Sequence, residues 1–420
     1  MRIAIIGAGI SGLTAAHELA LGHDVSVFEK ETRAGGHSNT VVIEEDGREL
    51  GLDTGFIVYN ERTYPHFTRL LAALGVVTQE SEMSLSVGCR RCGVEWCGRN
   101  LRGLFARPAQ IFRPSHHRML LEVLRFNRAG AAAARDERLA RHTLGRFLSE
   151  RGYSEAFRRH YVLAMGGAIW SSDLASFEEF PLQVFLRFLQ NHGLLTVRDQ
   201  PPWRTVVGGS RRYVEAILRR LAGRVHLGCA AVGVRRRGAL VEIDLADGRR
   251  AVFDRVVFAT HSDQALRLLR DPSDVEGRAL RAIRYQPNEA ILHTDGRLLP
   301  RSPHARASWN VHLDDCRDRG AMLSMTYSLN RLQRLPTRTP YCVTLNSAPA
   351  IDPARILRRI RYEHPVYDFA ALEAQRVLRS LAGDRGTYFA GAYLGYGFHE
   401  DGVSAARAVV ASIEREREAA

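Results

Sequence analysis

The stretch Arg2–Lys30, RIAIIGAGISGLTAAHELALGHDVSVFEK, decides the fold of this chain. It opens with RIAII, a short and partly β-branched apolar run that ends in glycine, as buried parallel strands do. Apolar residues then recur at helical spacing in LTAAHELA, and DVSVFE predicts a second strand that ends at Glu29. The stretch therefore predicts a strand–helix–strand unit with a glycine-rich turn after its first strand.

The glycines of this turn suit a bound dinucleotide. In the motif Gly7-x-Gly9-x-x-Gly12, the first glycine permits a tight turn, the second lets the backbone approach a pyrophosphate, and the third lets the helix pack closely. The helix N-terminus offers free N–H groups and partial positive charge to the phosphates. Glu29 suits the two ribose hydroxyls of an adenosine. A glycine-rich turn without a ligand is the alternative.

A second glycine-rich turn follows directly after the second predicted strand and indicates which dinucleotide is bound. ETRAGGHSNTV carries Gly35 and Gly36 after Arg33, and LDTGFIVYN places Gly55 before a β-branched and aromatic run. With these motifs the sequence resembles the flavin-dependent amine oxidase superfamily, which includes monoamine and polyamine oxidases, protoporphyrinogen oxidase and carotenoid desaturases. The resemblance implies bound FAD. His37 stands where the family usually has an arginine.

The resemblance continues in VVGGSRRYVEAILRRL and in the closing stretch YFAGAYLGYGFHEDGVSAARAVVASI. It implies that the backbone of Val232 holds the adenine edge and that the last strand–turn–helix lies under the flavin. Asp401 is then expected to cap the last helix. The N–H groups of Gly402 and Val403 would stabilise the negative charge of the reduced ring.

The predicted FAD contacts come from both ends and the middle of the chain. They are Gly7, Gly9, Ser11, Gly12, Glu29, Gly35, Gly36, His37, Thr54, Gly55, Phe56, Ile57, Val232, Gly391, Asp401, Gly402 and Val403. We expect the FAD to be non-covalent, because relatives that bind flavin covalently use a cysteine near the C-terminus and no cysteine follows Cys342. A covalent link through His399 is the alternative, and a hydrogen-bonding histidine is favoured.

These motifs predict the fold class and the domain organisation. We expect an α/β chain with a Rossmann-like FAD-binding domain assembled from residues 1–75, 205–275 and 355–420. Residues 76–204 and 276–354 would form an α+β substrate domain, a sheet covered by helices. The spacing of HHRMLLEVLRFNRAG and RLARHTLGRFLSERG predicts helices there, and RASWNVHLDD and CVTLNS read as strands.

The chemistry is less well defined by the residues. Many amine oxidases of the family use a lysine near the flavin, whereas the single lysine here, Lys30, follows the ribose acid. No catalytic base is named. The weak candidates for a role at the reacting centre, each with a structural role as the alternative, are Tyr59, Trp170, Trp309, His312 and His399.

A narrower resemblance suggests the substrate. DTGFIVYNERTYPHFTRLLAALGV, MSLSVGC, GGAIWSSD and GYGFHEDG resemble bacterial NAD/FAD-binding proteins associated with cyclopropane-fatty-acid-synthase-like enzymes. Some of these are implicated in desaturating methyl-branched acyl chains. We therefore predict an FAD-dependent oxidoreductase that desaturates an apolar, fatty-acyl or lipid substrate by hydride transfer to flavin N5. The alternatives are an amine oxidase, a flavin-dependent isomerase, and a non-catalytic flavoprotein that supports a lipid methyltransferase.

Composition bears on location and partners. The 420 residues carry a net charge of +13, and no run of about 18 apolar residues predicts a membrane span. We expect a cytoplasmic protein. Residues 101–142 contain nine arginines against three acids, interleaved with apolar residues. They suggest peripheral contact with an anionic membrane, with a solvated helix face as the alternative. Nucleic acid is not an expected partner, because no recognition motif accompanies the charge.

The cysteines leave one further question. CRRCGVEWC contains Cys89, Cys92 and Cys97, and His116 and His117 follow. A zinc site and a redox disulfide are alternatives for a CxxC motif. Because this motif has no second pair and fits a hairpin turn, inert thiols are favoured and no metal is predicted.

Overall fold

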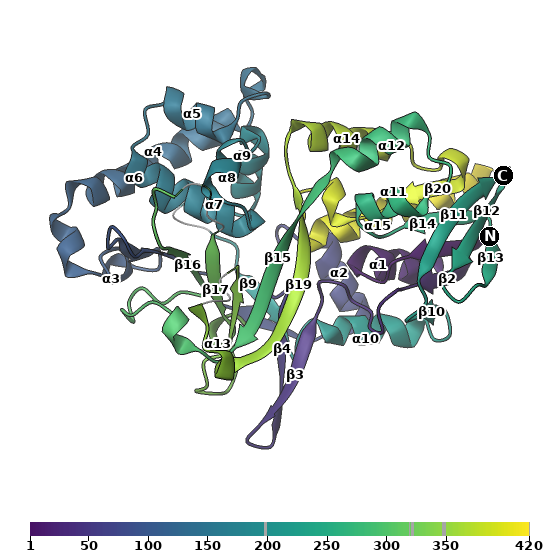
Figure 1. Ribbon diagram of the computed structural model, residues 1–420, viewed down its shortest axis with the longest axis horizontal. Coiled ribbons are helices and arrows are strands. Elements are labelled where there is room, and N and C mark those ends of the chain that lie inside the picture. Colours follow the sequence, from purple (N-terminus) through teal and green to yellow (C-terminus); the bar gives the residue numbers. More distant parts are fainter. Residues whose placement is uncertain (197–199, 319, 321–322, 347–349, 420) are drawn as a thin grey trace.

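The structure is a computed structural model that describes residues 1–196, 200–318, 320, 323–346 and 350–419. Two lobes stand side by side and long strands run between them (Figure 1). The N- and C-termini lie close together at the outer edge of one lobe. None of the described helices is both long and apolar enough to cross a membrane.

The lobe that holds both termini is built on a five-stranded parallel sheet. Its strands, in the order β10-β2-β1-β14-β20, are Val225–His226, Asp24–Phe28, Arg2–Ile6, Arg255–Phe258 and Thr387–Phe389. Successive residues of β1 face opposite sides: Ile3 and Ile5 join one apolar cluster, and Ala4 and Ile6 join another. The sheet is therefore buried on both faces, as a parallel sheet requires.

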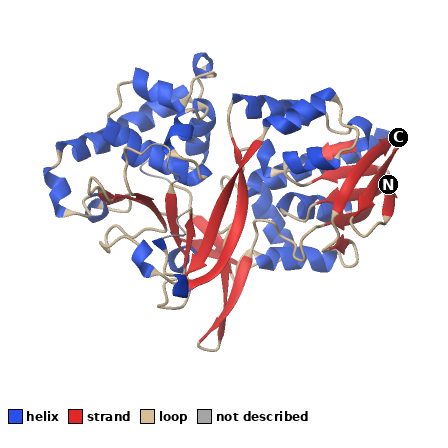
Figure 2. Ribbon diagram, viewed as in Figure 1, coloured by secondary structure: helices blue, strands red, loops and turns tan. Residues whose placement is uncertain are grey.

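Helices cover both faces of this sheet (Figure 2). The cluster around Ile3 and Ile5 contains residues of helices α1 (Ile10–Leu19), α2 (Pro65–Leu74), α10 (Arg211–Arg220) and α15 (His399–Ala419). On the opposite face lie α11 (Ser262–Leu268), α12 (Asp274–Ala282), α14 (Phe369–Ser380) and the antiparallel strands β11 (Ala231–Arg237), β12 (Leu240–Leu245) and β13 (Arg250–Phe253).

The second lobe contains a seven-stranded sheet and a helical layer. Its strands, in the order β19-β15-β18-β17-β16-β7-β8, are Ile356–Val366, Arg284–His293, Cys342–Leu345, Ser324–Ser328, Trp309–Leu313, Leu85–Cys89 and Glu95–Cys97. The helices of this lobe are α3 (Leu101–Leu104), α4 (Pro114–Ala133), α5 (Leu144–Glu150), α6 (Glu155–Phe157), α7 (Leu163–Trp170), α8 (Leu174–Glu178) and α9 (Leu182–Asn191). Residues of β7 and β16 share one apolar cluster with α4–α9.

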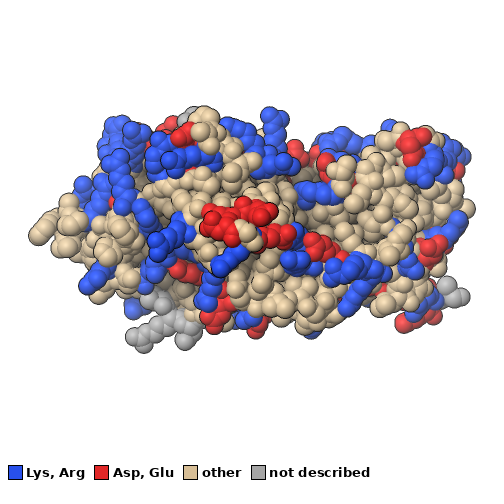
Figure 3. All heavy atoms as spheres, turned by 90° about the horizontal axis from the view of Figure 1, so that it is seen from below, with Lys and Arg blue, Asp and Glu red and all other residues tan. Residues whose placement is uncertain are grey.

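Smaller elements complete the region between the lobes. The hairpin β3 (Thr40–Glu45) and β4 (Arg48–Asp53) packs with α13 (Leu329–Leu332) against β15 and β18. The strands β5 (Tyr59–Asn60), β9 (Trp203–Val206) and β6 (Thr78–Ser81) form a three-stranded antiparallel sheet. In the view from below, acidic side chains group at the centre, where the β3–β4 hairpin points toward the viewer (Figure 3).

The predicted fold class is confirmed: the chain combines a Rossmann-like lobe with a sheet covered by helices. The division into domains stays a prediction, and one boundary differs from the observed strands. The predicted FAD-binding segments include residues 356–366, whereas β19 pairs with β15 in the second sheet. The run RYEHPV does not reveal that this segment joins the second sheet, because the partners of a strand are set by tertiary pairing. The predicted helix over RLARHTLGRFLSERG is also shorter, since Thr143 caps α5.

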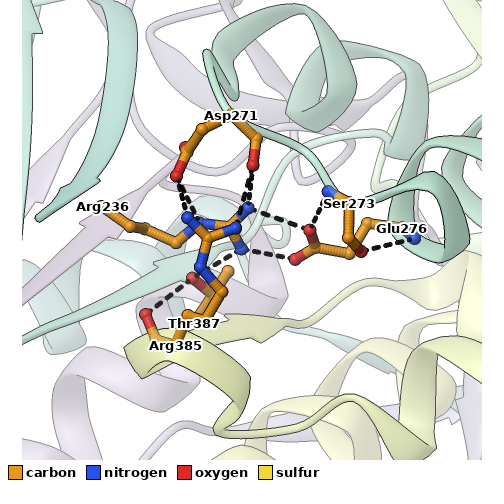
Figure 4. A network of polar contacts seen from close by, with 6 residues as sticks. All are labelled: Arg236, Asp271, Ser273, Glu276, Arg385 and Thr387. Carbon is orange, nitrogen blue, oxygen red and sulfur yellow. Dashed lines mark hydrogen bonds and ion pairs between the residues drawn. The ribbon is translucent and has the colours of Figure 1, made fainter. Parts of the chain in front are cut away.

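A buried ion-pair network holds the first lobe together (Figure 4). The Arg236 guanidinium on β11 donates to both carboxylate oxygens of Glu276, at 2.5 and 2.9 Å, and both side chains are 1% exposed. It also contacts Asp271, which pairs with Arg385. Burial raises the pKa of Glu276, but the hydrogen bonds from Arg236 outweigh it and hold that pKa below its usual value. The network connects β11, α12 and the turn before β20.

We predict that Arg236→Ala lowers the free energy of unfolding by about 3–5 kcal/mol, because it leaves Glu276 buried without its counterion. The matched control is Arg237→Ala, since the side chain of Arg237 is 61% exposed and pairs with Glu242 at the surface; its cost should stay below about 1 kcal/mol. Urea unfolding of both variants measures the difference. Equal midpoints would show that the buried network contributes no net stability.

Candidate active site

A cavity of about 1290 Å³ lies between the two lobes and is lined from both. One end is formed by the glycine turn after β1, the end of β2 and the turns around Gly36 and Gly55. The other end is formed by side chains of α4, α7 and α9 and of the second sheet. We call these the nucleotide end and the apolar arm.

The glycine motif after β1 shapes the nucleotide end. Gly7 has φ +102°, and a Cβ there would lie 2.7 Å from the carbonyl oxygen of Ala259. A Cβ on Gly12 would lie 1.9 Å from the carbonyl oxygen of Gly7, so the helix approaches the strand as closely as backbone allows. At Gly9, which lines the cavity, a Cβ would meet none of the described atoms within 4 Å. The space above Gly9 is the cradle that a diphosphate needs.

The second glycine turn lies directly beside the first. The N–H of Gly35 donates to the carbonyl of Ala8 at 2.8 Å, and Gly35 forms a parallel bridge with Gly9. Gly36 lines the cavity, and a Cβ on it would lie 3.2 Å from Cα of Gly9. Both predicted turns therefore meet at one place, where two glycine backbones leave room for a ligand.

Glu29 lies at the end of β2, as the sequence motif predicted for a ribose acid. Its carboxylate accepts the N–H of Ala8 at 2.7 Å and that of Glu31 at 3.0 Å. The side chain is half-buried and lines the cavity. These hydrogen bonds fix the carboxylate at the nucleotide end, in a position to accept ribose hydroxyls.

His37 enters the cavity wall as a neutral ring. It stacks on Tyr362 with ring centroids 4.6 Å apart, and its Nε2 is buried without a partner among the described residues. Burial, followed by the charges of His364 and other nearby groups, holds the pKa of His37 well below its usual value. Unlike the arginine that the family usually has here, His37 brings no positive charge toward a phosphate. Thr54, which is not among the lining residues, donates to the carbonyl of Asn39 at 2.8 Å, and its hydroxyl lies 3.0 Å from that of Tyr362.

The last helix begins earlier than predicted, and this corrects three expected roles. Helix α15 starts at His399, so Asp401 is its third residue and not its cap. The Asp401 carboxylate reaches back to accept the N–H of Phe398 at 2.9 Å, as the third residue of a capping box does. The N–H of Gly402 donates to the carbonyl of Phe398, so it is not free to hold a ligand. Val403, one residue further on, lies beyond the open N–H groups of the first turn.

Gly402 instead serves the packing of the two nucleotide-end helices. A Cβ on Gly402 would lie 2.8 Å from Ile10 Cγ2 and 2.9 Å from Ser11 Oγ. The N-termini of α1 and α15 therefore lie side by side at the cavity, where Ser11, Gly391 and His399 are lining residues. The N–H groups of residues 399–401, which have no carbonyl one turn back, replace Gly402 and Val403 as the candidates for stabilising an anion.

His399 is held between two helices and a glycine turn. Its Nε2 lies 3.0 Å from Ser38 Oγ and 2.7 Å from the Tyr213 hydroxyl, and its ring stacks on Phe56 at 3.7 Å. Burial lowers the pKa of His399 to about 3, so the ring is neutral. This geometry fits the favoured prediction of a hydrogen-bonding histidine. The partners Ser38 and Tyr213 were missed, since only tertiary packing brings them to the last helix.

A buried carboxylate, that of Asp53, connects the segments that support the nucleotide end. Asp53 accepts hydrogen bonds from Thr40 Oγ1 at 2.6 Å, from the Ser210 N–H at 2.9 Å and from Ser210 Oγ at 2.7 Å. Burial raises the pKa of Asp53 to about 6, although these hydrogen bonds oppose the shift. The contact ties the β3–β4 hairpin to the turn of Gly208 and Gly209, and thereby supports the cavity wall at Gly55.

The remaining predicted contacts divide between the cavity and the core. Gly55, Phe56 and Ile57 line the cavity. Val232 does not: its carbonyl accepts from Arg270 at 2.7 Å, and the cavity wall is formed by Ala230 and Ala231. A β-bulge between Ala231 and Gly233 interrupts the pairing of β11 with β12 at this point.

The weak catalytic candidates also divide. Trp170 and Trp309 line the cavity, and the indole of Trp170 donates to the carbonyl of Tyr396 at 3.1 Å. Tyr59 is 2% exposed, packs in the core beside Phe67 and lies outside the lining. His312 lies outside the lining and hydrogen-bonds the backbone of Leu298, which is the structural role that the sequence left open.

The lining also contains a histidine that the sequence did not reveal. His364, on β19, lies in the cavity wall with its Nδ1 3.2 Å from Ser171 Oγ and 3.1 Å from Asn288 Nδ2. Burial lowers the pKa of His364 to about 4. The alternation of Tyr362 and His364 on one face of a strand is the available signal, but the sequence analysis places this segment in the FAD-binding domain and predicts no strand there.

We predict that Gly9→Asp abolishes flavin retention and leaves folding intact. Gly9 caps α1 with φ −75° and ψ −175°, which any residue adopts, and aspartate is a favourable cap. Its side chain would fill the cradle and repel a diphosphate, weakening FAD binding by at least about 100-fold. Gly12→Ala is the matched variant, because its Cβ clashes with backbone and should cost about 3 kcal/mol of stability. Flavin absorption and thermal unfolding separate the two effects; a yellow Gly9→Asp variant would contradict the cradle.

Comparisons with known proteins agree with this geometry. The family described as flavin containing amine oxidoreductase matches residues 10–347. An L-amino-acid oxidase of Pseudechis australis is 22% identical over 70% of this chain and 57% of its own length. A 4,4'-diapophytoene desaturase of Staphylococcus aureus is 50% identical over 11% of this chain and 9% of its own. The chain thus spans about half of the first relative and a tenth of the second.

Solved structures share the fold over nearly the whole chain. A CLA-producing fatty acid isomerase from P. acnes superposes with a TM-score of 0.70 at 16% identity, covering 98% of both chains. Cyclohexylamine oxidase from Brevibacterium oxydans gives 0.70 at 17% identity, covering 99% of both. The family match extends over most of the sequence, and the glycine cradle fits the cofactor that the family name implies. The chain belongs to the flavin containing amine oxidoreductases, and FAD is its cofactor.

Proposed function

We propose that this flavin oxidoreductase dehydrogenates an apolar, fatty-acyl or lipid substrate at a carbon–carbon bond. The observation that carries the proposal is the apolar arm of the cavity. It is lined by Met119, Leu120, Val123 and Leu124 of α4, by Met165 and Ile169 of α7, by Phe188 of α9, and by Leu85, Trp309 and Tyr327 of the sheet. An acyl chain would bury its methylene groups against such a wall, each contributing about 0.8 kcal/mol.

The charges of the arm disfavour an amine substrate. Among the described lining residues, the carboxylates are Glu29 and Glu363. Glu29 lies at the end of β2, and Glu363 lies 3.4 Å from His261, just beyond β14. Burial lowers the pKa of His192, at the end of α9, to about 4, so this histidine is neutral too. A cationic substrate in the arm would therefore find no counterion among these residues.

The residues of this chain would bind and orient the substrate. When bound, FAD supplies an acceptor for the hydride that leaves one carbon of the substrate, and the second hydrogen leaves as a proton to water. Trp170 is fixed by its hydrogen bond to Tyr396 and packs on Phe188 and Phe398, so it presents a rigid wall. An electron acceptor outside this chain would be needed to restore the oxidised cofactor.

Isomerisation of the same substrate class is the second candidate. It is favoured by the shared fold of the fatty acid isomerase together with the apolar arm. A protein that binds an unsaturated acyl group beside a flavin could support either desaturation or isomerisation. The two reactions differ in their electron balance. An isomerase needs reduced flavin and consumes no electron acceptor, whereas a desaturase leaves its flavin reduced.

Anaerobic incubation with phospholipids that carry saturated, methyl-branched or unsaturated acyl chains tests the proposal. We predict loss of the yellow flavin absorption and a new double bond in the chain by mass spectrometry. A shifted double bond with pre-reduced protein, together with no bleaching of the oxidised protein, would establish the isomerase. Bleaching by amines and not by acyl chains would overturn both.

A matched pair of variants links that activity to the arm. Val123 lines the arm, and Leu121 on the same helix is 68% exposed and does not. Val123→Trp should shift the preferred acyl chain toward shorter lengths and leave flavin content unchanged, while Leu121→Trp should alter neither. An unchanged chain-length profile in Val123→Trp would remove the arm from the substrate site.

We further propose that the substrate reaches the arm from an anionic membrane. Exposed apolar side chains gather before and along α4: Leu101 is 76%, Ile111 51% and Phe112 85% exposed. Leu124, which lines the arm, is itself 45% exposed. Basic side chains flank this end of the molecule at the left of Figure 3. Each cation near such a surface contributes about 1 kcal/mol.

We predict that the protein sediments with vesicles containing phosphatidylglycerol and that added salt weakens the binding. Replacing Leu101 and Phe112 together by serine should reduce the bound fraction by about tenfold, since their apolar area no longer inserts. Leu21→Ser, an 88% exposed leucine of the other lobe, is the control. Equal sedimentation of both variants would assign the membrane contact elsewhere.

A further inference from the structure

Three cysteines and a histidine meet in the second lobe, away from the flavin site. The ligand atoms of Cys89, Cys92, His160 and Cys316 all lie within 4.8 Å of one another. Cys92 Sγ lies 3.4 Å from His160 Nε2. Cys89, His160 and Cys316 are buried, and Cys92 is half-buried. All four thiol or imidazole groups therefore point to one centre.

The local backbone holds these groups in place. Cys89 ends β7, and the turn to β8 closes through the N–H of Gly93, which donates to the carbonyl of Cys89 at 2.9 Å with φ +68°. Cys316 follows β16, whose Leu313 accepts the N–H of Arg90 at 2.8 Å. The Trp96 indole donates to the carbonyl of His160 at 3.0 Å. Three separate segments are thus fixed around the centre.

His160 sits in an irregular part of the helical layer. Residues Arg158–Val162 form one turn of π-helix between α6 and α7. Such turns are rare and occur frequently at functional sites, where the extra residue redirects a side chain. Here the turn brings the imidazole of the helical layer to the cysteines of the sheet.

We propose that Cys89, Cys92, Cys316 and His160 bind one zinc ion. Tetrahedral zinc with Cys₃His ligands has Zn–S of about 2.3 Å and Zn–N of about 2.0–2.1 Å, which places ligand atoms roughly 3.5–3.8 Å apart. The cluster lies within small side-chain adjustments of that spacing. Four protein ligands leave no open position, so the ion is structural.

The surroundings fit the charge of such a site. Three thiolates and Zn²⁺ carry a net charge of −1. Arg90 and Arg91 stand between the two cysteines of the turn, and Arg113 donates to the carbonyl of Cys92 at 2.8 Å. Backbone N–H groups of Cys92 and Cys316 face the Cys89 sulfur, and that of Val94 faces the Cys92 sulfur. Such N–H groups stabilise thiolate ligands.

The ligand set differs from what the sequence spacing offered. Cys97, third in the CxxC stretch, lies in β8 outside the cluster. His116 Nε2 lies 2.8 Å from the carbonyl of Leu104, and His117 Nε2 lies 2.7 Å from that of Ile111. The zinc would instead join the helical layer to the sheet beside the apolar arm, because Trp96 and Tyr161, neighbours of the ligands, line the arm.

Metal analysis of the purified flavoprotein tests the proposal, independently of any substrate. Protein from zinc-supplemented cells should contain about one zinc per chain. Cys316→Ser and His160→Asn should reduce this to a small fraction, whereas Cys97→Ser and His117→Asn should retain it. Flavin content and circular dichroism establish that each variant is folded.

Cobalt exchange provides a second readout. Co²⁺ in the wild-type protein should give the visible absorption of a tetrahedral site and a thiolate charge-transfer band, both absent in Cys316→Ser. A wild-type chain without metal and without the cobalt spectrum would overturn the proposal. So would a Cys89–Cys92 disulfide found by mass spectrometry in the protein as purified, or equal metal loss in Cys97→Ser and Cys316→Ser.

Discussion

The structure depends on how closely helix α1 is held at its N-terminus. Gly12 touches the carbonyl of Gly7, and Gly402 of the last helix touches Ile10 and Ser11. A methyl group at either contact would push the helix away from the sheet or from its partner helix. Because both helices keep this distance, two N-termini and two glycine turns meet at one end of the cavity.

The nucleotide end obtains its polarity from the backbone more than from charged side chains. His37, His364 and His399 are all held neutral, since burial lowers their pKa values. Helix N-termini supply partial positive charge without that desolvation cost. Cofactor and substrate would therefore share a wall of neutral rings, which suits an uncharged acyl chain at the other end.

Local sequence predicted the strand, turn and helix of the nucleotide end, because the positions of Gly7, Gly12 and Glu29 follow from short-range geometry. It failed where partners come from tertiary pairing. The RYEHPV run pairs with β15, and this pairing places His364 in the cavity wall, which the sequence did not predict. The predicted start of α15 is three residues too late, since the Asp401 carboxylate caps the helix from its third residue and not from the N-cap position. The cysteine cluster needed a histidine 68 residues away from Cys92.

The pairing of α1 with α15 has a consequence for the order of folding. Gly402 packs against Ile10 and Ser11, although these residues are far apart in the sequence. Contacts between distant segments have a larger loop-closure entropy cost than local contacts and form later. The nucleotide end is therefore completed only when α15 docks on α1, and a chain in which α15 is undocked would hold its cofactor weakly.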